Sequence, residues 1–125
     1  MAIKKYFLIL SFFSVSSIAL LYGINPHWFA RTFLGVAELD LNLAHILRAV
    51  MGLYVALGLF WLVSAFSATH RNTAVLTFMI FCAGLLVGRI ISFFADGSPA
   101  PLLQLYIAIE ASAVPAAYWV YRLKE

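Results

Sequence analysis

The sequence predicts an all-α integral membrane protein, a bundle of four transmembrane helices with a short interfacial helix between the first and second spans. Of its residues, 65% are hydrophobic and only 10% are charged, and the mean hydropathy is +1.00. Soluble domains carry about 25% charged residues. A chain of 125 residues has room for about four spans of roughly 20 residues and for no separate soluble domain. We therefore expect one domain covering residues 1–125.

The first span is predicted over residues 6–23, directly after Lys4 and Lys5. A basic start before an apolar run also describes a signal peptide, and residues 17–19 faintly resemble a cleavage site. The apolar stretch continues beyond that point. We therefore expect an uncleaved first helix.

A short helix is predicted to follow at Asn25-Pro26, since Asn is suited to capping a helix and Pro to its first turn. Phe29, Phe33 and Val36 then recur at helical spacing. This pattern favours a helix lying in the membrane interface. It is either a connecting helix with an apolar face or a lid over a site at that surface.

Three further apolar runs predict the remaining spans, at residues 42–66, 73–94 and 102–121. Polar segments at 67–72 and 96–101 separate them, and the second of these contains the turn-forming residues Gly and Pro. The predicted helices therefore cross the membrane in an up-and-down order.

The lysines and arginines at the span ends predict the orientation. One side of the predicted bundle carries five basic residues and the opposite loops carry only Arg31. The positive-inside rule therefore places both termini in the cytoplasm. The basic residues form no solvated stripe, so we expect no nucleic-acid partner. The five residues are Lys4, Lys5, Arg71, Arg122 and Lys124.

Three charged residues lie inside predicted spans. Arg48 is about six residues from the outer end of its helix, Arg89 about seven and Glu110 about nine, which corresponds to depths of about 9 to 14 Å. A charge near the bilayer centre costs roughly 2.5 to 3.5 kcal/mol and normally faces the bundle interior with a partner. We therefore predict that all three meet in the outer half of the membrane.

The helical faces extend this polar cluster to His45, which shares a face with Arg48, and to Tyr106, which shares one with Glu110. Two arginines and one glutamate leave a positive charge in surplus unless Asp96, two turns from Arg89, closes it. Two interpretations stay open. The pairs either lock helices together, although buried ion pairs stabilise poorly, or form a cavity whose surplus arginine binds an anionic or carbonyl-bearing head group. The predicted cluster is Arg48, Arg89, Glu110, Asp96, His45 and Tyr106.

The sequence favours no cofactor and no metal site. Cys82 is the single cysteine, which excludes an intramolecular disulfide and a CxxC motif. His27, His45 and the outer acids show no metal-binding spacing, and no GxSxG nucleophile motif occurs. We therefore lean toward a protein that is not an enzyme.

Small residues form two stripes that allow helices to approach closely. One is a GxxxG motif on the third span, and the other lies roughly opposite Glu110 on the fourth. Such contacts are most often made within one chain, but the fourth-span stripe can also serve a partner chain. The residues are Gly84, Gly88, Ala108, Ser112 and Ala116.

The order of these features resembles a family of small bacterial four-helix inner-membrane proteins known only as a domain of unknown function, with a weaker likeness to DoxX-like membrane proteins. The resemblance spans nearly the whole chain. It implies the four-helix fold, the bacterial inner membrane and the polar constellation, and no activity. It rests on Pro26, Asp40, Arg48, Ala49, Gly52, Gly88, Arg89, Asp96, Gly97, Pro99 and Glu110.

Two functions follow as predictions. The leading one is an accessory or interaction subunit of a membrane complex, with a membrane protein or a second copy as its partner, because short loops leave few other ways to act. The alternative is a small binding or transport module for an amphipathic ligand, a lipid or quinone, held at Arg48 and Arg89.

Overall fold

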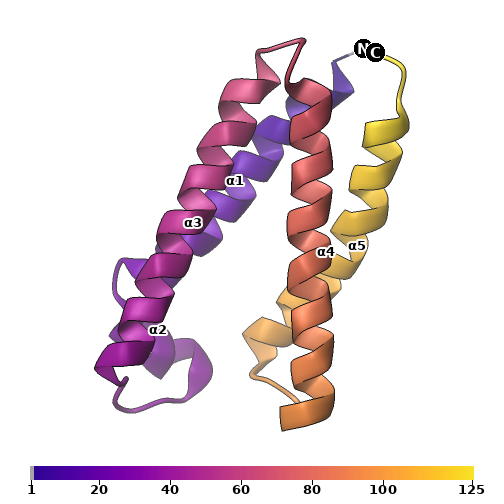
Figure 1. The fold of residues 1–125 in the computed structure, drawn as a ribbon. Coiled ribbons are helices and arrows are strands. Elements are labelled where there is room, and N and C mark those ends of the chain that lie inside the picture. Colours follow the sequence, from indigo (N-terminus) through magenta and orange to yellow (C-terminus); the bar gives the residue numbers. More distant parts are fainter. Residues whose placement is uncertain (1) are drawn as a thin grey trace.

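The computed structural model describes residues 2–125 as four long helices and one short helical segment (Figure 1). The long helices are α1 (Ile3–Gly23), α3 (Leu41–Ala65), α4 (Arg71–Asp96) and α5 (Pro101–Arg122). The segment α2 (Pro26–Phe29) continues into one π-helical stretch, η1 (Ala30–Leu34), between α1 and α3. The predicted all-α fold is confirmed.

Three of the helices, α1, α3 and α4, are long and apolar enough to cross a membrane. The shortest of them has 21 residues and is about 31 Å long, against a hydrocarbon core of about 30 Å. Helix α5 has 22 residues and runs back along α4 to the end of the bundle where α1 begins (Figure 1). The protein is therefore a multi-pass membrane protein.

The segment after α1 forms as its sequence predicts. Asn25 caps α2 by accepting a hydrogen bond from the Trp28 amide at 3.1 Å, and Pro26 occupies the first turn. Gly35 ends η1 in a left-handed conformation with φ of 69°, which glycine adopts at little cost. Phe29 is fully buried and packs edge-on against Tyr22 of α1. The segment is therefore anchored to the bundle by an aromatic contact.

The long helices form two pairs. Helix α1 packs most extensively against α3, and α4 against α5, while contacts between the pairs are fewer. The pairs approach each other at the end that holds both termini and the α3–α4 turn, and they separate toward the opposite end (Figure 1). We call that opposite end, which carries α2, η1 and the α4–α5 turn, the distal end.

The end with the termini is tied together by polar contacts. The Glu125 carboxylate accepts hydrogen bonds from the Ile3 and Lys4 amides at 2.8 and 3.0 Å. The Lys4 ammonium donates to the side chain of Asn72 at 2.7 Å. These bonds satisfy backbone N–H groups that a helix start leaves free. They also join α1 to the segments that follow α5 and begin α4.

The core between the pairs is aromatic. Trp61 of α3 is fully buried, packs edge-on against Phe78 and Phe81 of α4, and donates its indole N–H to Thr77 at 3.1 Å. An indole that both packs and donates a hydrogen bond fixes helix register as well as distance. This contact holds α3 to α4 in the half of the bundle near the termini.

Close approach of helices occurs at glycines other than the predicted ones. A Cβ at Gly58 of α3 would lie 2.8 Å from Ser16 Oγ of α1, and one at Gly23 of α1 would overlap Met51 of α3. At Gly84 and Gly88 an added Cβ would meet nothing within 4 Å. Within residues 2–125 the GxxxG motif on α4 therefore makes no close helix contact, because α3 diverges from α4 at that level, and its use by a partner chain stays a prediction. The α5 stripe, Ala108, Ser112 and Ala116, is exposed as well.

Candidate functional site

An ion pair in the distal half of the bundle joins α4 to α5. The Arg89 Nε donates hydrogen bonds to both carboxylate oxygens of Glu110, at 3.1 and 2.9 Å. The side chains are 19% and 9% exposed, respectively. Two of the three charged residues predicted to meet therefore do so.

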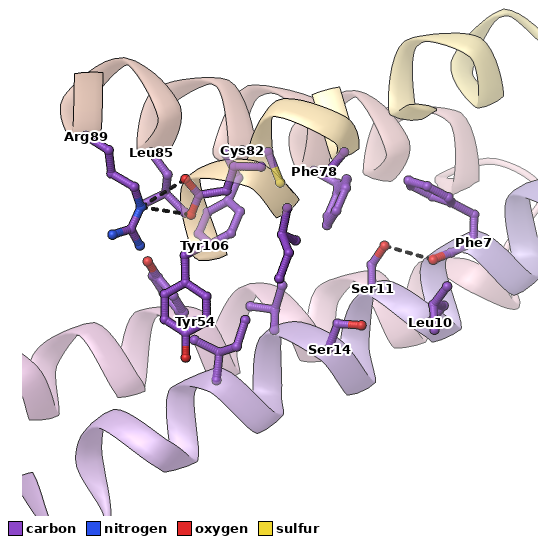
Figure 2. Close-up of a pocket in the computed structure, with 16 residues that line it drawn as sticks. Phe7, Leu10, Ser11, Ser14, Tyr54, Phe78, Cys82, Leu85, Arg89 and Tyr106 are labelled. Atoms are coloured by element: carbon purple, nitrogen blue, oxygen red, sulfur yellow. Dashed lines mark hydrogen bonds and ion pairs between the residues drawn. The ribbon is translucent and has the colours of Figure 1, made fainter. Parts of the chain in front are cut away.

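Both carboxylate oxygens share one N–H of the guanidinium. The two terminal nitrogens of Arg89 make no hydrogen bond to Glu110, and they lie on the side of the guanidinium away from the dashed bonds in Figure 2. A guanidinium has five N–H donors arranged in a planar fork. The edge of this fork that suits a polar ligand group is therefore not occupied by the carboxylate.

A cluster of three tyrosines, contributed by three helices, lies beside Arg89. The Arg89 Cζ lies 5.5 Å from the ring centre of Tyr106, as in a cation–π contact. The ring centre of Tyr22 on α1 is 6.1 Å from that of Tyr106 and 6.2 Å from that of Tyr54 on α3. All four long helices therefore contribute to the surroundings of Arg89.

A cavity of about 210 Å³ extends from this ion pair toward the end with the termini. Arg89, Glu110 and Tyr106 lie at one of its ends, and Phe7 with Phe78 lies at the other (Figure 2). Phe78 and Arg89 are eleven residues apart on α4, so the cavity extends over about 16 Å of helix. Apart from the ion pair and two serines, its lining is apolar or aromatic.

The cavity opens sideways between α1 and α5. Leu10 and Ser14 of α1 and Ile109 of α5 line it and are exposed, Leu10 by 65% and Ile109 by 47%. Helices α1 and α5 also make few contacts with each other. In a membrane this opening faces lipid, so an apolar molecule can reach the cavity without crossing water.

Arg48 and His45 lie outside this site. Both are exposed, and within residues 2–125 Arg48 has no ion pair. Helix α3 turns Tyr54, Gly58 and Trp61 toward its neighbours, and Arg48 lies about 120° around the helix from Tyr54. The prediction that Arg48 faces the bundle interior is therefore wrong, and His45 follows it because the two share a face.

Asp96 is exposed at the end of α4 and accepts a hydrogen bond from Ser92 Oγ at 2.8 Å. Of the two arrangements left open, the structure therefore has Asp96 away from Arg89. Because Glu110 already balances Arg89 and Arg48 lies elsewhere, the site carries no surplus positive charge.

Tyr22, Tyr54 and the cavity serines were not predicted. Ser11 Oγ donates to the backbone oxygen of Phe7 at 2.8 Å, and Ser14 is exposed at the opening. Tyr22 and Tyr54 lie within apolar runs, where a polar hydroxyl tends to find a partner when buried. A tyrosine hydroxyl inside an apolar run was the available signal for a site residue. The direction in which each tyrosine points, however, depends on how the helices pair.

Cys82 is buried in the cavity wall as a free cysteine. Among the described residues, no group of three or more His, Cys, Asp or Glu side chains is arranged to hold a metal ion.

Comparison with known protein families identifies the family of the chain. A family described as Domain of unknown function (DUF4345) matches residues 3–121. The chain belongs to the DUF4345 family. That match covers the whole site and all of the helices except the last residue of α5, so the cavity of this DUF4345 protein lies within the domain itself. No curated protein and no solved structure matches the chain.

Proposed function

We propose that this DUF4345 protein binds a neutral amphipathic lipid, such as a quinone or another molecule with one slender apolar chain. The chain lies in the cavity, and the polar head group accepts hydrogen bonds from Arg89. The observation that carries the proposal is the Arg89–Glu110 geometry at the end of an apolar cavity, in which the carboxylate binds only Nε. This is the predicted binding module, with Arg89 kept as a ligand-binding residue and Glu110 beside it in place of Arg48.

The charge and the size of the cavity support this ligand class. Arg89 and Glu110 balance each other, so an anionic head group would leave an uncompensated charge in a low-dielectric site. The cavity volume of about 210 Å³ is below the roughly 300 to 1,000 Å³ of sites for drug-sized molecules. A single chain with a neutral, hydrogen-bond-accepting head group therefore fits better than a two-chain phospholipid.

Decylubiquinone binding to the protein in lipid nanodiscs tests the proposal. Quinones quench tryptophan fluorescence, and Trp61 packs against Phe78 and Phe81 of the cavity wall. We expect saturable quenching that 1-dodecanol reduces by competition. Linear quenching without saturation, with no effect of 1-dodecanol, would show partitioning into the bilayer and contradict the proposal.

Two variants and a matched control locate the binding. Ser14→Phe places a ring at the opening, whereas Ser17→Phe places the same ring on α1 at an exposed position outside the cavity lining. We expect at least tenfold weaker binding for the first and no change for the second. Arg89→Lys keeps the charge but removes the planar fork, and the loss of a charged hydrogen bond, about 1.5 to 3 kcal/mol, predicts about tenfold weaker binding or more.

The accessory-subunit function remains a prediction, favoured by one observation. Ala108, Ser112 and Ala116 form an exposed stripe of small residues along α5, which suits a partner helix. Purification in mild detergent tests it, because a subunit should retain a stoichiometric protein partner. The cytoplasmic location of both termini and the bacterial inner membrane also stay predictions, which protease protection in oriented vesicles and cell fractionation check.

A further inference from the structure

A second, smaller cavity of about 90 Å³ lies on the distal side of Arg89, between the end of α4 and the start of α5. Arg89 lines both this recess and the larger cavity. Arg89 and Ser92 supply its polar side chains, and Phe93, Gly97, Pro99, Leu103 and Ile107 complete the lining. The guanidinium therefore stands between an apolar cavity and a recess that ends at the α4–α5 turn.

Polar contacts hold the turn that forms the mouth of the recess. Gln104 Nε2 donates hydrogen bonds to Ser98 Oγ at 3.0 Å and to the backbone oxygen of Pro99 at 2.8 Å. Gly97 has a φ of 101° and no atom within 4 Å of an added Cβ. The turn is thus fixed against α5 while the space beside Gly97 stays open. Ser92 and Asp96, bonded to each other, add polar atoms near this mouth.

The two ends of the combined space differ in polarity. A water molecule needs about 10 to 15 Å³ of cavity, so a recess of about 90 Å³ holds several waters beside polar partners. At the opposite end, Phe7 and Phe78 pack edge-on with ring centres 5.2 Å apart. The recess therefore has room and two polar side chains for water, Arg89 and Ser92, whereas the opposite end is closed by aromatic rings.

We propose that the recess is a hydrated passage joining the distal surface to Arg89, and that it takes the polar head group of the ligand. The ligand then lies with its head group toward the α4–α5 turn and its chain toward Phe7 and Phe78. This orientation rests on the proposed function, whereas the hydration of the recess does not. A head group in the recess keeps part of its hydration.

Thiol labelling in nanodiscs tests the hydration directly. A cationic methanethiosulfonate reacts with thiolates, which form in water and are disfavoured in apolar surroundings. In a Cys82→Ala background, Ile107→Cys reports on the recess, and Ala108→Cys reports on an exposed, lipid-facing position one residue away. The two sites differ in depth by only about 1.5 Å. We expect at least tenfold faster labelling at position 107, and equal rates would overturn the proposal.

A second pair of cysteine variants controls for misfolding of the first pair. Leu103 lines the recess and Leu105 is exposed outside it, so Leu103→Cys should label faster than Leu105→Cys by a similar factor. If neither recess position labels faster than its control, the passage is not hydrated and the proposal fails.

Decylubiquinone then separates the orientation from the function. Bound ligand should slow labelling of Ile107→Cys at least threefold and leave Ala108→Cys unchanged. Saturable binding in the fluorescence assay without this protection would overturn the head-group orientation while the proposed function stands. Fast labelling at position 107 with no saturable binding would contradict the proposed function and support the hydrated passage.

Discussion

Replacing both members of the Arg89–Glu110 pair should cost far less stability than replacing either one. The side chains are only 19% and 9% exposed, so each charge depends on the other for compensation. Removing one partner of a buried pair costs about 3 to 5 kcal/mol, whereas apolar replacement of the whole pair is often neutral or stabilising by about 1 to 4 kcal/mol. The Arg89–Glu110 pair is therefore expected to stabilise the fold no better than two apolar side chains would.

We expect Arg89→Met and Glu110→Met each to lower the free energy of unfolding by about 3 kcal/mol. The double variant should lie within about 1 kcal/mol of the wild type. Reversible unfolding in bicelles, followed by tryptophan fluorescence, measures all three. Arg31→Met is the matched control, because Arg31 is exposed and lies outside the membrane-spanning helices, and it should change the free energy of unfolding by less than about 0.5 kcal/mol.

The double variant also separates the two interpretations of the ion pair. If it is folded and stable but no longer binds decylubiquinone, the pair is kept for ligand binding. A double variant that loses as much stability as the single variants would refute this reasoning. The pair would then be a net stabiliser that locks α4 to α5.

Two further predictions concern helix contacts. Gly58→Leu should destabilise the protein by about 1 to 3 kcal/mol through overpacking, since an added Cβ already lies 2.8 Å from Ser16 Oγ. Gly84→Leu, with nothing within 4 Å of an added Cβ, should not destabilise the protein in the same bicelle assay, because glycine inside a helix carries an entropic cost that leucine removes. Hydrogen bonds from the Lys4 and Ile3 amides lower the pKa of the Glu125 carboxyl. The contact between the Glu125 carboxylate and these amides is therefore present at neutral pH and is lost as the pH falls through the lowered pKa. The Lys4 amide NMR signal should titrate with an apparent pKa below that of an ordinary glutamate, and Glu125→Gln should abolish the titration; a Lys4 signal unaffected by pH would contradict the contact.

Several residues of the site could be predicted from sequence alone, because their depth in the membrane depends on distance along the chain. Arg89 and Glu110 lie on either side of one short turn, so equal depth on neighbouring antiparallel helices nearly ensures that they meet. Tyr106 followed because it lies one turn from Glu110 on the same face. Arg48 has a similar depth but lies on a helix that pairs mainly with α1, and depth does not reveal rotation about the helix axis.

The sequence by itself determined that the chain crosses a membrane, where its helices begin and end, and which charges lie within them. Bilayer thickness sets the length of apolar run that a span needs. Turn residues end helices through their own backbone preferences, so both features can be read locally in the sequence. Only the tertiary structure decided which face of each helix is buried. Lipid is as apolar as a protein core, so hydropathy barely distinguishes the two faces of α1 and α3. Helix pairing therefore determined that Arg89 faces a cavity and Arg48 faces outward.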